Sequence, residues 1–365
     1  MIRLAKSFLL FGLILNVIAE AVGQAHVWAV AVETFARGLE TPWAIDFASD
    51  GRAFITERPG RVRVIENGKL HAQPWISIDV AAVGEAGLLG LAIDPQFERN
   101  RFVYVAYTYR TGALQLRNRL VRLREDGKTG NGSVDKILID DVPGANNHDG
   151  GRVKFGLDGK LYWTVGDAQT TRYAQNLKSL NGKILPLNSD GSIPTDNAFA
   201  NSYVYSYGHR NPQGLAWEPI SGRLFATEHG PSGFQGCCRD EVNLIEPGKN
   251  YGWPETRGND TRDGMIAPLL HAGTSETWAP GGAAFATQGP WSGSLLFTGL
   301  RGQTLYRVSW TAPAQVKWKN WSATSRASSG ACAISSRDRT KRSICSPAIV
   351  TAAAAQDRRM TGFYG

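Results

Sequence analysis

The chain has 365 residues, of which 42% are hydrophobic and 20% charged, so it is long enough to bury a large core in one or two domains. Most of its formal net charge of +8 comes from the C-terminal end, because residues 321–365 hold seven Lys or Arg against two Asp or Glu. The rest of the chain is nearly neutral and lacks the basic surface expected of a nucleic-acid-binding protein. The 41 glycines, with 11 Trp and 11 Tyr, favour an all-β protein.

The first 25 residues have the pattern of a secretory signal peptide. Arg3 and Lys6 precede an apolar run over residues 8–18, and small residues follow up to Ala25. This run is too short to span a bilayer of ~30 Å, so we expect a cleaved signal and a periplasmic mature protein. The alternative is an uncleaved membrane anchor.

One short pattern recurs along the chain: a turn containing Gly, then an apolar strand that ends near Thr. Its copies are residues 50–57, 158–164, 221–228 and, more weakly, 292–298. The glycine permits the positive φ of a tight hairpin, and the residues after it suit a buried strand. Hairpins at irregular spacing, separated by long loops, indicate a β-propeller over residues 26–320 rather than a β-sandwich.

Two acid–base candidates lie next to predicted strands. His148 directly precedes a strand at residues 153–155, and an imidazole that titrates near neutral pH can act as a general base. Asp167 follows the strand at residues 161–165, where a carboxylate can orient a histidine. The simpler alternatives are a His that bonds a turn carbonyl and an Asp that caps its own turn.

Two later segments carry groups suited to an anionic cofactor and a metal ion. Arg210 and Asn211 lie in the polar segment 207–217, and a guanidinium binds carboxylate or quinone oxygens through a planar fork. The Gly230-Pro231 pair offers main-chain carbonyls, and Glu241 offers a carboxylate, both of which Ca²⁺ accepts as ligands. Taken singly, each segment also fits an ordinary loop.

The four cysteines do not form a recognisable framework. Cys237 and Cys238 are adjacent, whereas Cys332 and Cys345 lie in the C-terminal segment. Adjacent cysteines match no zinc-site spacing and cannot join distant strands. In an oxidising compartment they can form a vicinal disulfide, and two free thiols are the alternative.

Taken together, these segments resemble the soluble PQQ-dependent aldose sugar dehydrogenases, the glucose/sorbosone dehydrogenase family. The resemblance covers residues 38–310 and is most specific in Gly-His-Arg-Asn-Pro-Gln-Gly-Leu-Ala at 208–216 and Asn-Tyr-Gly-Trp-Pro at 250–254. It implies a six-bladed β-propeller that holds pyrroloquinoline quinone (PQQ) and Ca²⁺ in a central cleft. The implied reaction is oxidation of an aldose sugar at its anomeric carbon to a lactone, with hydride transfer to the quinone and a periplasmic electron acceptor.

The resemblance also implies roles for single residues. His148 is expected to take the proton of the anomeric hydroxyl, with Asp167 and Arg210 as further catalytic residues and Glu85 on the substrate side. The residues implied as PQQ contacts are Arg210, Asn211 and Arg301. The residues implied as calcium ligands are Gly230 and Pro231 at the cofactor, and Glu241 and Tyr251 at a second, structural ion.

The C-terminal end departs from this family. After about Trp318 the sequence becomes rich in Ser, Ala and Arg, and residues 322–365 show no blade pattern. We interpret residues 321–365 as an aberrant tail of low order, either natural or produced by a reading-frame shift, since a neighbouring frame of its codons can encode an Asp-Gly hairpin of the family's type. The last blade is therefore expected to be incomplete, and the chain poorly stable and weakly active.

Two other classes of function stay open. A metal-dependent propeller lactonase or other hydrolase would need Glu, Asn and Asp side chains around a metal in the central channel. A non-catalytic propeller that binds a partner through its loops is compatible with the altered tail. The identity of the sugar, the electron acceptor and the oligomeric state do not follow from the sequence.

Overall fold

The computed structural model describes residues 34–232, 236–310 and 318–326, the last nine by their backbone alone. These residues lie in one compact unit that begins at Glu33. The predicted signal peptide (residues 1–25) and residues 327–365 of the predicted tail lie outside the described part. None of the helices in the described part is long and apolar enough to cross a membrane.

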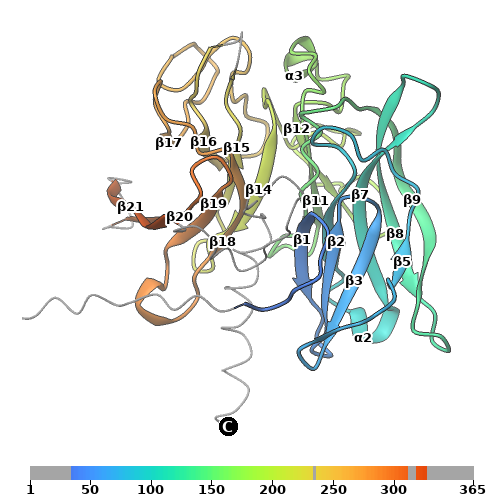
Figure 1. The fold of residues 1–365 in the computed structure, drawn as a ribbon. Helices are drawn as coiled ribbons and strands as arrows, with labels where there is room; N and C mark the ends of the chain where they lie inside the picture. The colour runs from blue at the N-terminus through green and yellow to red at the C-terminus, as the bar shows by residue number, and fades with distance from the viewer. Residues whose placement is uncertain (1–33, 233–235, 311–317, 327–365) are drawn as a thin grey trace, which may run out of the picture. The chain divides into compact units, whose positions relative to one another are not determined.

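Within the described residues, five antiparallel sheets follow one another in chain order (Figure 1). The first consists of β1 (Pro42–Phe47), β2 (Ala53–Glu57), β3 (Arg61–Glu66) and β4 (Lys69–Leu70), with β5 (Ile76–Ser77) also paired to β3. The second consists of β6 (Leu88–Ile93), β7 (Phe102–Arg110), β8 (Leu116–Glu125) and β9 (Gly132–Pro143). The third consists of β10 (Val153–Phe155), β11 (Leu161–Val165), β12 (Lys183–Leu187) and β13 (Ser206–Tyr207).

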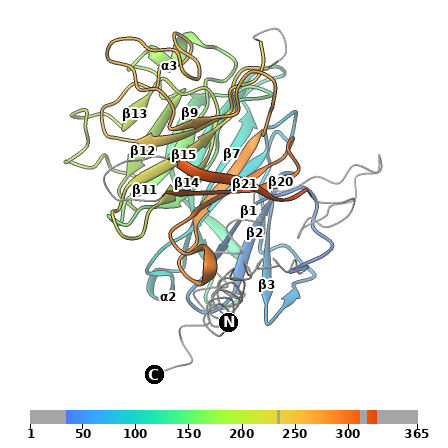
Figure 2. The same ribbon diagram turned by 90° about the vertical axis from the view of Figure 1, so that its left-hand side faces the viewer.

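The fourth and fifth sheets likewise consist of four consecutive strands that pair in chain order. The fourth consists of β14 (Pro212–Trp217), β15 (Leu224–Glu228), β16 (Glu241–Ile245) and β17 (Leu270–His271). The fifth consists of β18 (Pro280–Phe285), β19 (Leu295–Gly299), β20 (Thr304–Trp310) and β21 (Trp318–Arg326), and Figure 2 shows β21 alongside β20. In the part of the chain that the structure describes, short helical turns also join strands: α2 (Phe97–Asn100), α3 (Arg172–Gln175) and η2 (Gly289–Trp291).

The recurring sequence pattern forms the second strand of each sheet. Its four recognised copies correspond to β2, β11, β15 and β19, whose residues are all buried. The same place in the second sheet is taken by β7, where Arg101 adopts a positive φ of 59° instead of the usual glycine. The pattern did not predict this fifth copy, because its turn has Arg101 in place of the glycine that defines the other copies.

The threonine that ends each copy is buried in all five sheets. These residues are Thr56, Thr108, Thr164, Thr227 and Thr298, each at most 2% exposed. Two of them join neighbouring sheets, since Thr56 Oγ1 donates to the carbonyl of Leu89 in β6 and Thr227 Oγ1 donates to that of Gly281 in β18, both at 2.6 Å. At these two positions the threonine thus links one blade to the first strand of the next.

The hydrophobic core is a series of layers between successive sheets. Phe54 of the first sheet packs with Val103 of the second, and Tyr104 of the second packs with Trp163 of the third. Ile184 and Leu215 connect the third and fourth sheets, while Phe225 and Phe297 connect the fourth and fifth; these pairs belong to two further clusters. Sheets that pack face to face in chain order are the arrangement of a β-propeller, as predicted.

The predicted number of six blades is wrong for the described residues, 34–232, 236–310 and 318–326, which form five sheets. Six blades came from the family resemblance, whereas the repeat itself, with its copy at β7 included, counts five. The predicted boundary at residue 320 also falls inside β21, so the blade continues to Arg326. Pairing with β20 needs only backbone N–H and C=O groups, which a Ser- and Thr-containing segment supplies without a hydrophobic alternation.

Candidate active site

A cavity of about 590 Å³ opens among loops at the ends of strands from all five sheets. Six of the residues predicted from sequence line it: Glu85, His148, Arg210, Gly230, Pro231 and Arg301. The other four predicted residues, Asp167, Asn211, Glu241 and Tyr251, are not among the lining residues. Its volume lies in the range of sites for small molecules and cofactors.

His148 is held by a buried carboxylate. Its Nδ1 lies 2.8 Å from Oδ1 of Asp167, and Asp167 is fully buried. Asp167 is held in turn, because its Oδ1 accepts the amide of Gln169 and its Oδ2 accepts Nε1 of Trp253, both at 2.8 Å. A carboxylate only accepts, so Nδ1 of the neutral imidazole carries the hydrogen and Nε2 is left as the acceptor.

The backbone around His148 depends on glycine. His148 has φ of 65°, in the left-handed region that residues other than Gly, Asn and Asp seldom adopt. A side chain at Gly166 would meet the His148 carbonyl at 2.0 Å, and this carbonyl accepts the amide of Ala168 at 3.0 Å. The Gly-Asp pair after β11 therefore lets the histidine loop approach the strand end closely enough for Asp167 to reach the imidazole.

Glu85 and Asn211 connect the histidine loop to the rest of the wall. Oε2 of Glu85 accepts Nδ2 of Asn211 at 3.2 Å and the amide of His148 at 3.3 Å. Oδ1 of Asn211 accepts the amide of Gly150 at 3.0 Å. Asn211 thus uses both ends of its amide within the protein, and its predicted contact with a cofactor stays a prediction. Arg58 supports the Glu85 loop by donating to the carbonyls of Ala86, at 3.2 Å, and Gly84.

Arg210 connects the loop of Asp167 with the loop that follows β15. Its amide donates to Glu228 and its carbonyl accepts the amide of Asp167 at 2.7 Å. Its guanidinium donates to the carbonyl of His229 at 3.2 Å and lies over the ring of Trp253 at 5.4 Å. Burial lowers the pKa of Arg210, and the nearby carboxylates, first Asp167 and Glu228, oppose that effect.

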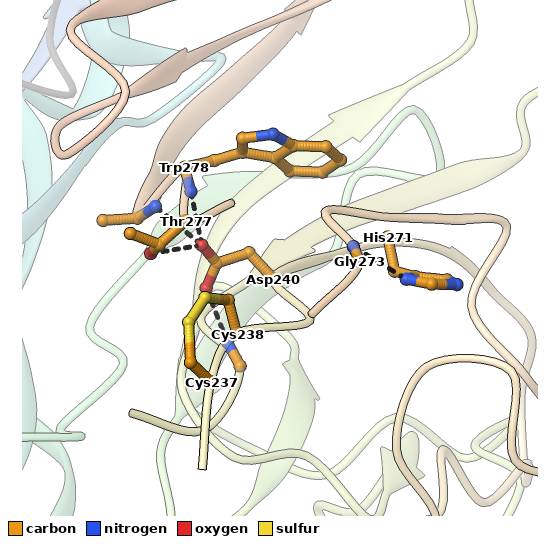
Figure 3. The surroundings of a disulfide bond; sticks show 9 residues. Cys237, Cys238, Asp240, His271, Gly273, Thr277 and Trp278 are labelled. Atoms are coloured by element: carbon orange, nitrogen blue, oxygen red, sulfur yellow. Dashed lines mark hydrogen bonds between the residues drawn. A yellow bond between two sulfur atoms is a disulfide. The ribbon is translucent and has the colours of Figure 1, made fainter. Parts of the chain in front are cut away.

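The Gly230-Pro231 pair is packed against a disulfide loop. Cys237 and Cys238 are joined by a disulfide, one of the two alternatives expected from sequence, and Cys237 lines the cavity (Figure 3). A side chain at Gly230 would lie 2.1 Å from the carbonyl oxygen of Cys238 and 2.3 Å from that of Arg239, so only glycine fits there. The main chain of Gly230 and Pro231, which forms one wall of the cavity, therefore depends on the loop at residues 237–239 for its position.

Glu241 and Tyr251, the predicted ligands of a structural calcium ion, face a second, much smaller cavity that Gly230 and Pro231 also line. The Tyr251 hydroxyl donates to the carbonyl of Leu244 at 2.6 Å and accepts the amide of Glu246 at 2.8 Å. Burial raises the pKa of Glu241 to about 8. In the part of the chain that the structure describes, no group of three or more His, Cys, Asp or Glu is arranged to hold a metal ion. The calcium ligands stay a prediction that relies mainly on carbonyl oxygens.

Several lining residues were not predicted. Arg58, His229 and Leu300 each come two positions after the buried threonine of a repeat copy, so the repeat itself carried the signal for their position. Asp240 lines the cavity directly before Glu241, and Trp43 lies in the β1 strand. For Asp240 the sequence offered no signal beyond a charged pair in a loop.

The comparisons with known proteins include a family model and two curated sugar dehydrogenases. The family model described as Glucose / Sorbosone dehydrogenase matches residues 39–326. Aldose sugar dehydrogenase of Escherichia coli (strain K12) is 34% identical over 257 residues, covering 63% of this chain and 64% of that protein. Quinoprotein glucose dehydrogenase B of Acinetobacter calcoaceticus is 35% identical over 253 residues, covering 60% of this chain and 51% of that protein.

A solved structure extends the likeness to the fold. The PQQ-bound aldose sugar dehydrogenase from Streptomyces coelicolor superposes with a TM-score of 0.70 at 35% identity, covering 81% of this chain and 84% of that one. By contrast, the chain spans only about half to two thirds of the length of the two curated relatives.

Proposed function

Because the chain belongs to the glucose/sorbosone dehydrogenase family, we propose that it oxidises aldose sugars at the anomeric carbon to lactones, with PQQ and Ca²⁺ as cofactors. The observation that carries this proposal is the imidazole of His148, oriented by Asp167 and lining the same cavity as Arg210 and Arg301. We also propose that residues 1–25 export the protein to the periplasm, where an electron acceptor reoxidises the cofactor.

The lining of the cavity fits the proposed cofactor. PQQ carries three carboxylates, and three guanidiniums, those of Arg58, Arg210 and Arg301, line the cavity. Arginine binds carboxylates through charge-assisted, often bidentate hydrogen bonds. Gly230 and Pro231 line the same cavity, and main-chain carbonyls are ligands that Ca²⁺ accepts. These residues would hold the cofactor and its ion.

The chain's own contribution to the reaction is to move a proton. The chemistry that PQQ supplies when bound is the acceptance of a hydride from C1 of the sugar, with a calcium ion polarising the quinone carbonyl. Nε2 of His148 would accept the proton of the anomeric hydroxyl, because Nδ1 is committed to Asp167. The buried Asp167 carboxylate would then stabilise the imidazolium without taking the proton itself.

Glu85 would orient the sugar. Its carboxylate lines the cavity and is fixed by Asn211 and by the amide of His148. A carboxylate accepts hydrogen bonds from sugar hydroxyls, so Glu85 would place the anomeric carbon relative to the imidazole.

The test is reconstitution of the purified chain with PQQ and CaCl₂. PQQ uptake is followed by its absorbance, and turnover by reduction of an artificial dye with a panel of aldoses. His148→Gln should keep PQQ uptake and lower kcat by about 10²–10⁴-fold, the usual contribution of a general base.

His71→Gln is the matched control, because His71 is an exposed histidine paired with Glu66 outside the cavity lining. This variant should turn over at the wild-type rate. A His148→Gln enzyme with wild-type kcat, or a wild-type chain that takes up no PQQ, would contradict the proposed function.

A further inference from the structure

We propose that Asp240 is the positioning residue of the cofactor side of the cavity: its carboxylate ties the Gly230-Pro231 wall to the turn at residues 277–279. This inference deepens the proposed function and depends on it for its consequence, since the tied wall is the one that would hold Ca²⁺ and PQQ.

The Asp240 carboxylate accepts four hydrogen bonds from two loops (Figure 3). Oδ1 accepts the amide of Gly230 at 2.8 Å. Oδ2 accepts the hydroxyl of Thr277 at 2.9 Å and the amides of Trp278 and Ala279 at 2.6 and 2.9 Å. A carboxylate has about four lone-pair sites, so the four donors match its acceptor capacity in number, with three of them on Oδ2.

The turn at residues 277–279 is hydrogen-bonded in turn to a third loop, at residues 300–302. The carbonyl of Trp278 accepts the amides of Arg301 and Gly302 at 3.1 and 3.2 Å, and the carbonyl of Ala279 accepts the amide of Leu300 at 3.0 Å. The loops after β15, before β18 and after β19 are therefore joined through one carboxylate. Each of them contributes residues to the cavity lining, Arg301 among them.

Three of the four donors are main-chain amides, so the carboxylate fixes backbone rather than a side chain. The Gly230 amide lies in the peptide plane that joins His229 to Gly230, and a shift of this plane also moves the next one, which carries the Gly230 carbonyl. The contact has little tolerance, because the Gly230 backbone lies so close to the carbonyls of Cys238 and Arg239 that an added Cβ would meet them at 2.1 and 2.3 Å. Loss of the negative acceptor would let the wall relax away from the turn.

Three variants distinguish the specific link made by Asp240 between the loops from the general support that any buried carboxylate gives the fold. Asp240→Asn replaces one acceptor oxygen by an NH₂ group, so it cannot satisfy donors on both sides. Thr277→Val removes a single donor and leaves the carboxylate. Asp94→Asn is the matched control: Asp94 is another buried carboxylate, which accepts the Gln96 amide and the Tyr104 hydroxyl but does not line the cavity.

The first measurement is hydrogen exchange of the chain without cofactors. In Asp240→Asn the amides of Gly230, Trp278 and Ala279 should exchange about tenfold faster or more, since each loses a charged acceptor. In Asp94→Asn their exchange should stay within about twofold of wild type.

The second measurement is the Ca²⁺ concentration needed for half-maximal PQQ uptake. It should rise about tenfold in Asp240→Asn, about threefold in Thr277→Val and less than about twofold in Asp94→Asn. At saturating Ca²⁺, kcat of Asp240→Asn should stay within about threefold of wild type, because His148 and Asp167 are untouched.

Unchanged exchange at the three amides in Asp240→Asn would overturn the inference. If the wild-type chain takes up PQQ, a wild-type Ca²⁺ requirement in Asp240→Asn would overturn it as well. A wild-type chain that takes up no PQQ would contradict the proposed function. The exchange data would still show whether Asp240 holds the two loops together. If Asp240→Asn does not fold, Thr277→Val decides the matter, with a wild-type Ca²⁺ requirement for PQQ uptake as the contrary result.

Discussion

The two sides of the cavity use the same chemical device for different ends. Each is built around a buried carboxylate with several donors: Asp167 on the His148 side and Asp240 on the Gly230 side. Asp167 orients a side chain, because its main partner is the imidazole. Asp240 orients backbone, because three of its four partners are amides. The proposed proton-transfer group and the proposed calcium-binding wall are thus supported in different ways, one through a side chain and the other through backbone amides.

This comparison implies that the two sides affect different kinetic quantities. Damage on the His148 side should lower kcat and leave cofactor uptake intact, whereas damage on the Gly230 side should do the reverse. Arg210 touches both, since its carbonyl accepts the Asp167 amide and its guanidinium donates to His229.

The largest effect after that of His148→Gln is expected for Asp167→Asn. An amide can present its NH₂ to the imidazole and favour the wrong tautomer, so kcat should fall about 10²–10³-fold with PQQ uptake unchanged. The measurement is steady-state dye reduction together with an absorbance titration of PQQ. Asp158→Asn, at the opposite end of β11, is the control and should keep wild-type kcat. Loss of cofactor uptake in Asp167→Asn would break the division between the two sides.

An intermediate effect, on stability, is expected for Asp149→Asn, next to His148. Burial raises the pKa of Asp149 to about 6, although the Ala145 amide and Asn118 Nδ2 donate to its Oδ1. Because the folded-state pKa lies above its ordinary value of about 3.9, the stabilising contribution is present below about pH 4 and is lost as the pH rises through 6. Relative to wild type, Asp149→Asn should therefore gain on the order of 1–3 kcal/mol in the free energy of unfolding between pH 4 and 7.5.

Urea denaturation at these two pH values measures the effect of Asp149→Asn. Asp126→Asn offers a contrast of opposite sign, because backbone hydrogen bonds, first that of Thr129, lower the pKa of Asp126. The contribution of Asp126 is present at neutral pH and lost as the pH falls, so its removal should matter least in acid. A pH-independent difference between Asp149→Asn and wild type would show that the buried carboxyl does not titrate in this window.

The smallest effect is expected for the double variant Cys237→Ser, Cys238→Ser. A disulfide that closes only two residues restricts the unfolded chain little, so we expect about 1 kcal/mol of lost stability. Because this loop runs directly into Asp240, the Ca²⁺ requirement for PQQ uptake should rise about twofold to threefold with kcat unchanged. Wild type treated with a dithiol reductant should match the variant. A fall in kcat instead would place the disulfide on the His148 side of the comparison.

The strands were largely predictable because their signal is local. A turn glycine, an apolar run and a terminal threonine marked β2, β11, β15 and β19, since a buried hairpin strand needs those residue types in that order. The second sheet was missed where Arg101 takes the positive φ of the glycine. The end of the fifth sheet was misjudged because β21 is held by backbone pairing, which leaves a weak mark on side-chain composition.

Residue types and motifs were enough to predict the all-β propeller class, the family and a set of candidate site residues, including His148, Asp167 and Arg210. These follow from residue types at short spacing. The folded structure was needed to show that the described residues make five sheets, that Asn211 binds Glu85 and Gly150, and that Asp240 joins three loops. Those outcomes depend on main-chain amides and carbonyls, which every residue carries, so their partners become known only when distant segments are brought together.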